Sequence, residues 1–282
     1  MTDSVIYDIL YLKLKEKIKF KQATAKEDGI EIRALAPMFR HKLAEPYWVR
    51  YEFDETLQNR PIHLTKHSDS AVVVHTVDSA EGRRSYLVRG SSPKSGGGGG
   101  GSSRAGGMQA FHCLSILDAV SGQAPKSTLC FLKEWEPAFD LSAIRSDMVK
   151  ASVAMFISEV IYRSLTAEVA EPDLFDWLCD AIVALNATEG PVANFHLWFL
   201  VSYCTKMGFR PGETLEPRGL FSPEEEALLY KVLRSPFEEA MMLPLSAEKR
   251  QNFCRRMLRY LSYHLGAEID ARSLDVLHEI FS

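Results

Sequence analysis

The chain has 282 residues, of which 46% are hydrophobic and 25% are charged, an ordinary composition for a globular protein. No apolar run reaches the about 18 residues that a membrane-spanning helix needs, and the opening residues lack the basic-then-apolar pattern of a signal peptide. The formal net charge of −4 excludes a uniformly basic nucleic-acid-binding protein. Five scattered cysteines without a Cys-x-x-Cys pair indicate buried thiols in a reducing compartment. We expect a cytoplasmic protein, large enough for two domains.

Residues 1–57 form the first block, in which basic and acidic residues balance. Apolar residues alternate with lysines over residues 12–21, and this period of two predicts a strand with one basic face, although the pattern could equally begin as a helix from Val5. The basic face is either a solvated edge strand or a DNA contact. Residues 47–54 are a second predicted strand. The block reads as an extra N-terminal segment without a legible function.

Residues 58–140 are predicted to form a small β domain. Strands are expected at residues 62–64, 71–77, 84–89, 111–120 and 127–135, with a turn at Ser121-Gly122-Gln123. A low-complexity Gly/Ser segment at residues 91–107 cannot bury enough apolar surface to order itself, so we expect a flexible loop there. Five short strands joined by long loops predict a barrel of the OB type.

Basic residues concentrate around the predicted hairpin at residues 71–89, although the whole chain is acidic. We expect these basic residues on the exposed side of the small sheet, followed directly by the basic loop. A basic sheet with a mobile basic loop is typical of proteins that hold a nucleic-acid backbone. The predicted DNA-binding residues are Lys66, Arg83, Arg84, Arg89, Lys94 and Arg104.

Motifs for metal binding or catalysis are weak. His63, His67 and His75 lack the spacing of a metal site and are more typical of a nucleic-acid face. The glycine run is not followed by the Gly-Lys-Ser/Thr of a phosphate loop. An enzyme acting on nucleic acid would need clustered carboxylates near the basic sheet, whereas Asp69 and Asp78 sit at strand or turn ends. We predict no catalytic residue, metal or cofactor.

From residue 141 onward the hydrophobic period becomes helical, which predicts an all-helical domain over residues 141–282. Ser222 is a predicted N-cap, followed by Pro223. Arg255 and Arg259 lie one turn apart and share a helix face, which is either a solvated face or a dock for an acidic peptide or DNA phosphate. The candidate partner-binding residues are Lys206, Arg210, Arg255 and Arg259, as the basic rim of a hydrophobic groove.

Four segments together resemble the RecO family of bacterial recombination mediators, in the style of Bacteroidetes members. Residues 62–90 resemble the family's first strands, with T-K-H-S-D-S-A-V-V-V followed by G-R-R-S-Y-L-V-R-G. Residues 145–165 resemble its long central helix, and N-F-H-L-W-F-L from Asn194 leads to G-F-R-P at residues 208–211. S-L-D-V-L-H-E-I from Ser273 resembles its C-terminal end. The resemblance covers roughly residues 60–282.

The resemblance implies an α+β multidomain protein, an N-terminal OB-fold barrel followed by a helical domain, without enzymatic activity. It implies a nucleoid-associated role in DNA repair and recombination: binding single- and double-stranded DNA, annealing strands, and working with RecR and the C-terminal tail of single-stranded-DNA-binding protein to load RecA. Some members carry a four-Cys zinc site after the G-F-x-P region, but residues 212–221 contain no Cys, so we predict no zinc. The extra residues 1–57 are either an added module or the product of an upstream start codon.

Overall fold

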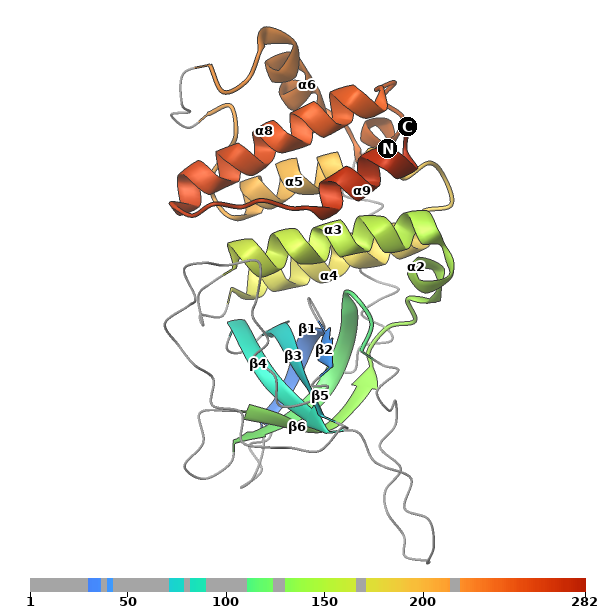
Figure 1. The fold of residues 1–282 in the computed structure, drawn as a ribbon, viewed down its shortest axis with the longest axis vertical. Helices are drawn as coiled ribbons and strands as arrows, with labels where there is room; N and C mark the ends of the chain where they lie inside the picture. The colour runs from blue at the N-terminus through green and yellow to red at the C-terminus, as the bar shows by residue number, and fades with distance from the viewer. Residues whose placement is uncertain are drawn as a thin grey trace, which may run out of the picture.

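A mixed β-sheet and a stack of helices make up the structure, which is a computed structural model (Figure 1). It describes residues 30–36, 40–42, 71–78, 82–89, 111–123, 130–165, 171–213 and 219–282. In Figure 1 the sheet occupies the lower half, and α3 and α4 are the helices nearest to it. Among the described segments, none of the helices combines the length and apolar character needed to cross a lipid bilayer.

The sheet closes on itself. Its strands are β1 (Ile30–Ala36), β2 (Arg40–Lys42), β3 (Ala71–Asp78), β4 (Gly82–Arg89), β5 (Ser115–Gln123) and β6 (Cys130–Pro137). They are hydrogen-bonded in the order β1-β5-β6-β4-β3-β2, and β1 also pairs with β3, so the sheet returns to its first strand. β4 and β6 run parallel, whereas the other pairs are antiparallel.

The β3–β4 hairpin confirms the two strands that the sequence predicts at residues 71–77 and 84–89. The valine-rich β3 suits a half-buried pleated surface. Gly82 begins β4 with a φ of +78°, a backbone conformation that residues with a Cβ rarely adopt. The last pair of the ladder joins Asp78 to Gly82. Inside the sheet, the hydroxyl of Tyr86 donates a hydrogen bond of 3.1 Å to the Asp78 carboxylate, which closes the hairpin end.

Two expectations about the sheet need correction. The predicted turn at residues 121–123 is wrong: these residues end β5 and pair with residues 130–132 of β6. The pairing of β5 with β6 shifts its register between Val120 and Ser121, next to Gly122. A glycine inside a strand often marks such a bulge. The predicted boundary at residues 57/58 does not divide the sheet, because β1 and β2 lie before it and pair with β3 and β5.

Several predicted features lie outside the described residues. They are the strands at residues 12–21, 47–54 and 62–64 and the loop at residues 91–107.

Every described element after β6 is a helix, as the change of hydrophobic period indicates. The helices are α2 (Ser142–Ser146), α3 (Met148–Ser164), α4 (Pro172–Ala187), α5 (Phe195–Lys206), α6 (Pro223–Arg234), α7 (Phe237–Met241), α8 (Ala247–Leu265) and α9 (Ser273–Ile280). The predicted N-cap is confirmed, since Ser222 and Glu225 form a capping box at the start of α6. α8 ends at Gly266, which takes the left-handed conformation.

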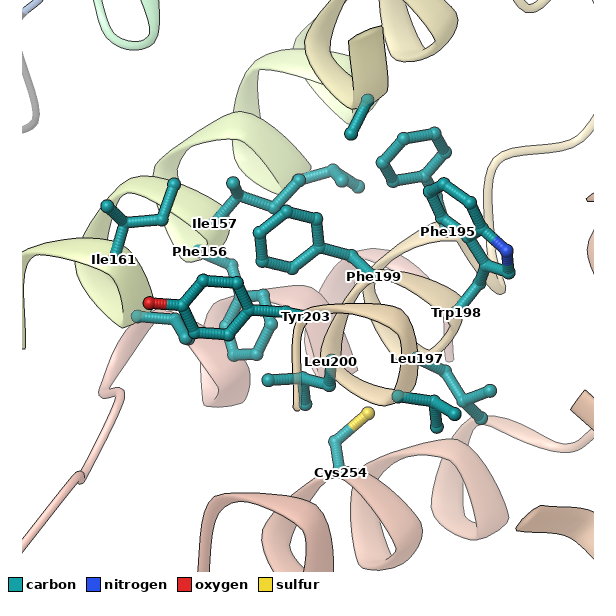
Figure 2. Close-up of a cluster of buried hydrophobic side chains, with 14 of the residues drawn as sticks. Phe156, Ile157, Ile161, Phe195, Leu197, Trp198, Phe199, Leu200, Tyr203 and Cys254 are labelled. Carbon is teal, nitrogen blue, oxygen red and sulfur yellow. The ribbon is translucent and has the colours of Figure 1, made fainter. Parts of the chain in front are cut away.

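One hydrophobic core runs from the helices into the sheet. Its centre is α5, whose Phe199 and Tyr203 face α3, while Cys254 of α8 lies beside α5 on another side (Figure 2). Val77, Leu114 and Ile116 belong to the same cluster although they come from the sheet region. A second, smaller cluster fills the sheet interior and is built from Val74, Tyr86, Val88, Phe111, Leu117, Ala119, Leu132 and Trp135. The sheet therefore packs against the helices through a shared core.

Candidate nucleic-acid interface and helical groove

The β3–β4 hairpin carries the arginines that the sequence assigns to DNA, and its register sets the direction of each. Tyr86 and Val88 are fully buried in the sheet interior, where Tyr86 lies opposite Val74. Successive strand residues face opposite sides, so Arg84 shares the face of Tyr86 and Arg83 lies on the other. The expectation that the basic residues share one exposed face is wrong, because strand alternation separates these two neighbours.

Arg83 packs against the end of α3. Its guanidinium carbon lies 4.5 Å from the ring centroid of Tyr162, and its Nη1 donates a hydrogen bond of 2.9 Å to the carbonyl of Leu165, the residue that caps α3. A cation is favoured there because the carbonyl end of a helix carries partial negative charge. His75, on the neighbouring strand, meets the same Tyr162 ring edge-on at 5.2 Å. This face of the hairpin is therefore covered by α3, and Arg83 joins the two regions.

The remaining predicted DNA-binding residues lie at the edge of the described segments or outside them. Arg89 is the last residue of β4 and pairs with Ala71. Its side chain, together with Lys66, Lys94 and Arg104, lies outside the described part of the chain, as do His63 and His67. Within the part that is described, no group of three or more His, Cys, Asp or Glu side chains is placed to hold a metal ion.

Further contacts fix the sheet against the helices. The thiol of Cys113 lies 3.5 Å from the carbonyl oxygen of Ala154 in α3, and burial raises its pKa to about 11, so it stays protonated. The Asn186 side chain at the end of α4 accepts from the backbone N–H of Ile144 and donates to the carbonyl of Asp140. The connection from β6 to α2 is thereby tied to α4, which helps to fix the sheet relative to the helices.

A groove of about 740 Å³ lies between α8, the segment after Gly266 and the start of α9. Arg255 and Arg259 line it together, as their spacing on one helix face predicts, over apolar residues that include Leu258 and Ile269. Nη2 of Arg255 lies 2.9 Å from Oδ1 of Asp275. Acidic residues also line the groove, namely Glu268, Asp270 and Asp275. The groove therefore presents both signs of charge above an apolar base.

The other two predicted partner-binding residues do not line this groove. Lys206 is exposed at the end of α5, where its charge acts on Asp180 of α4. Arg210 is exposed, with Nη1 3.9 Å from a carboxylate oxygen of Glu213. The structure brings Arg255 and Arg259 together and leaves Lys206 and Arg210 elsewhere on the surface.

Sequence reasoning missed the buried polar side chains that position these surfaces. Glu159 of α3 is 6% exposed, and its carboxylate accepts hydrogen bonds from the backbone N–H groups of Arg272 and Ser273 at the start of α9. Nδ2 of Asn194 lies within 3.1 Å of the carbonyl oxygens of Ala240, Met241 and Leu243. A lone acid in a helix that is apolar almost all round was the available signal for Glu159, because such a charge needs buried partners.

These features define an α+β protein in which a closed mixed sheet and a helical bundle share one core. The family model described as "Recombination protein O C terminal" matches residues 145–214, which span α3 to α5. The DNA repair protein RecO of Flavobacterium psychrophilum is 29% identical over 78% of this chain and 96% of its own length. The proteins of the same name from Phocaeicola vulgatus and Porphyromonas gingivalis are 27% and 28% identical with the same coverage. The chain is therefore similar to DNA repair proteins named RecO over most of its length, and its central helices match the RecO C-terminal family model.

Proposed function

We propose that this chain is a non-enzymatic protein of recombinational DNA repair. It binds single- and double-stranded DNA, anneals strands and, with RecR, helps to load RecA onto single strands coated with single-stranded-DNA-binding protein. The observation that carries the proposal is the similarity of this chain to proteins named DNA repair protein RecO, which align with it over nearly their whole length.

We further propose that the closed sheet is an OB-type barrel and the DNA-binding domain. Its ring of pairings, β1-β3-β4-β6-β5 and back to β1, supports a five-stranded closed barrel. On this proposal the barrel includes β1 and β2 as well as residues 58–140, and residues 141–282 form the helical domain. The described N-terminal strands then contribute to the barrel rather than to a separate module.

Within the barrel we propose Lys66, Arg89, Lys94 and Arg104 as phosphate contacts. Arg83 holds the barrel against α3, as its contacts with Tyr162 and Leu165 indicate. Arg84 lies on the same face of the strand as the buried Tyr86. Phosphate contacts of this kind give binding with little sequence preference and steep dependence on salt.

The test is a fluorescence anisotropy titration of single-stranded DNA over a range of salt concentrations. The triple variant Arg89→Ala, Lys94→Ala, Arg104→Ala should weaken binding and reduce the slope of log K against log salt by about 2, since each lost contact to single-stranded DNA removes about 0.7. The matched control is Lys231→Ala, Arg234→Ala, Lys249→Ala, which removes the same charge from helices α6 and α8. Equal slopes in both variants would contradict the assignment of the barrel as the DNA site.

A second function is favoured by the groove beside α8. We propose that Arg255 and Arg259 dock an acidic peptide tail, such as the C-terminal tail of single-stranded-DNA-binding protein, whose apolar side chains lie on the groove base. Arginine forks recognise carboxylates through paired hydrogen bonds, and Asp275 already accepts one hydrogen bond from Nη2 of Arg255. An incoming carboxylate therefore has to displace Asp275.

This docking is tested by titrating a labelled acidic peptide. Arg255→Ala with Arg259→Ala should weaken binding by at least about tenfold, because hydrogen bonds to charged groups are worth about 1.5–3 kcal/mol. Lys206→Ala with Arg210→Ala is the control, since it removes equal charge outside the groove. Asp275→Asn should strengthen binding by freeing Arg255. A larger loss in the control than in the groove variant would place the dock elsewhere.

A further inference from the structure

A small, partly open cavity lies where α5, α8 and α9 meet. His196 near the start of α5, Arg250 near the start of α8 and His278 in the last turn of α9 line it, and Phe281 closes one side. Its volume is about 10 Å³, comparable to the space that one water-sized ligand occupies. The cavity is distinct from the groove beside α8, although Leu274 lines both.

Three polar nitrogens of residues that line this cavity lack hydrogen-bond partners. They are Nδ1 of His196, Nε of Arg250 and Nδ1 of His278, all buried and without a partner among the described residues. His196 is 2% exposed and Arg250 is 8% exposed, so bulk water does not satisfy them. Native proteins rarely leave such groups unpaired, and here three belong to residues that line the same cavity. These residues therefore form a candidate binding site for a small ligand that accepts hydrogen bonds.

The described residues that line this site contribute the positive charge of Arg250 and no acidic side chain. The guanidinium of Arg250 donates to the backbone carbonyls of Leu245 and Phe281 and lies 5.4 Å from the Phe281 ring centroid, all of which are neutral groups. Among the described residues that line the cavity there is no Asp or Glu. Burial and the nearby Arg250 lower the pKa of His196 to about 3, so this imidazole is neutral and can carry its proton on Nδ1 as a donor.

We propose that the cavity binds one monovalent anion of halide size, such as chloride. Nε–H of Arg250 and the Nδ1–H groups of His196 and His278 donate to it, and its charge balances the buried guanidinium. A water molecule could satisfy the hydrogen bonds but would leave that charge without a counter-ion, which is costly in a low-dielectric interior. The bound anion joins three helices and holds α9, and through Leu274 it sets one wall of the groove.

The first test uses the unaltered full chain. Thermal unfolding is measured in sodium chloride, sodium bromide and sodium gluconate at equal ionic strength, since gluconate is too large for the cavity. Chloride and bromide should raise the Tm with saturation, by a few degrees on the order expected for a ligand that binds only the folded state. A Tm that depends on ionic strength alone, and not on the identity of the anion, would overturn the proposal.

The second test locates the ion. Crystals grown in bromide should show an anomalous peak within hydrogen-bond distance of Nε of Arg250, whereas a peak without anomalous signal would identify water and overturn the proposal. Arg250→Met should abolish the halide dependence of the Tm, and Lys249→Met, the exposed neighbour on the same helix, should retain it. Should Arg250→Met not fold, His278→Leu removes one donor from a half-buried position, and an unchanged halide dependence there would count against the site.

Discussion

The sheet and the helical region use buried polar side chains differently. In the helices these side chains join segments that are far apart in the chain: Glu159 caps α9 from 114 residues away, and Asn194 holds the carbonyls that end α7. Inside the sheet, Tyr86 and Asp78 meet within a single hairpin. The helical arrangement is therefore specified by long-range polar contacts, because each has to be satisfied for its partner segment to be buried.

This contrast shows which contacts orient the sheet and the helices relative to each other. The sheet interior has a small apolar cluster of its own, but Val77, Leu114 and Ile116 belong to the helical core. Arg83 adds a polar contact at the same junction. The helices determine their own packing, whereas the sheet is oriented by its contacts with α3 and by the link between Asn186 of α4 and the connection after β6. Substitutions at the polar contacts between helices and at the contacts between sheet and helices should therefore lower the free energy of unfolding by different amounts.

The largest loss is expected from Glu159→Ala. This change removes the acceptor of two backbone N–H groups at the start of α9 and leaves the largely buried Arg163, now 3.0 Å from Glu159, without its partner. Breaking a buried ion pair from one side costs about 3–5 kcal/mol, so the free energy of unfolding in urea should fall by about that amount.

Two variants sharpen this test. Glu159→Gln keeps the shape and one acceptor oxygen, and it should lose less than Glu159→Ala. Glu279→Ala, an exposed acid on α9 itself, should stay within about 0.5 kcal/mol of the unaltered protein. A Glu159→Ala loss no larger than that of Glu279→Ala would mean that α9 is held by its apolar contacts alone.

A smaller loss, confined to the junction, is expected from Arg83→Ala. Removing the hydrogen bond to Leu165 and the stacking on Tyr162 should lower the free energy of unfolding by about 1–2 kcal/mol. Arg83→Lys should lose much of the same stability, because an ammonium lacks the planar fork, while its charge and the salt slope of DNA binding stay unchanged. If Arg83→Ala instead flattened the salt slope and left stability intact, Arg83 would be a phosphate contact.

Local signals predicted the local features of this fold. The hairpin at β3 and β4 followed from the valine-rich residues 71–77, the turn chemistry at Gly82 and the alternation over residues 85–89, and the start of α6 followed from Ser222 and Pro223. β1 and β2 were not predicted, because their place depends on pairing with β3 and β5 far along the chain. The strand end at Ser121-Gly122-Gln123 was mistaken for a turn for the same reason: its residue types favour turns, and only β6 keeps them extended.

The candidate sites show the same division. Arg255 and Arg259 were placed together because helix spacing alone decides that they share a face. The role of Arg83 could not be predicted, since its partners Tyr162 and Leu165 come from another region of the chain. The separation of Arg83 from Arg84 is different, because it depends on strand alternation alone: neighbouring residues of a strand face opposite sides of the sheet.

The smallest effect concerns the rim of the helical region, where Asp180 lies between Asp176 and Lys206. Burial and the repulsion of Asp176, opposed by Lys206, raise the pKa of Asp180 to about 6. The folded state therefore holds a proton that the unfolded state releases, and stability should fall as pH rises from about 4 to about 6. Because Asp180 is partly exposed and screened, the loss should be about 1 kcal/mol, well below that of a fully buried group.

Asp180→Asn should remove this pH dependence and raise the free energy of unfolding at pH 7 by about 1 kcal/mol, measured by urea unfolding between pH 4 and pH 8. Asp176→Asn removes the repulsion and should shift the transition to lower pH, whereas Lys206→Met should shift it to higher pH. The three changes separate the effect of burial on the pKa of Asp180 from the effects of the two neighbouring charges, Asp176 and Lys206. A Lys206→Met variant without any shift would show that Lys206 is directed away from Asp180 and is free to meet a partner.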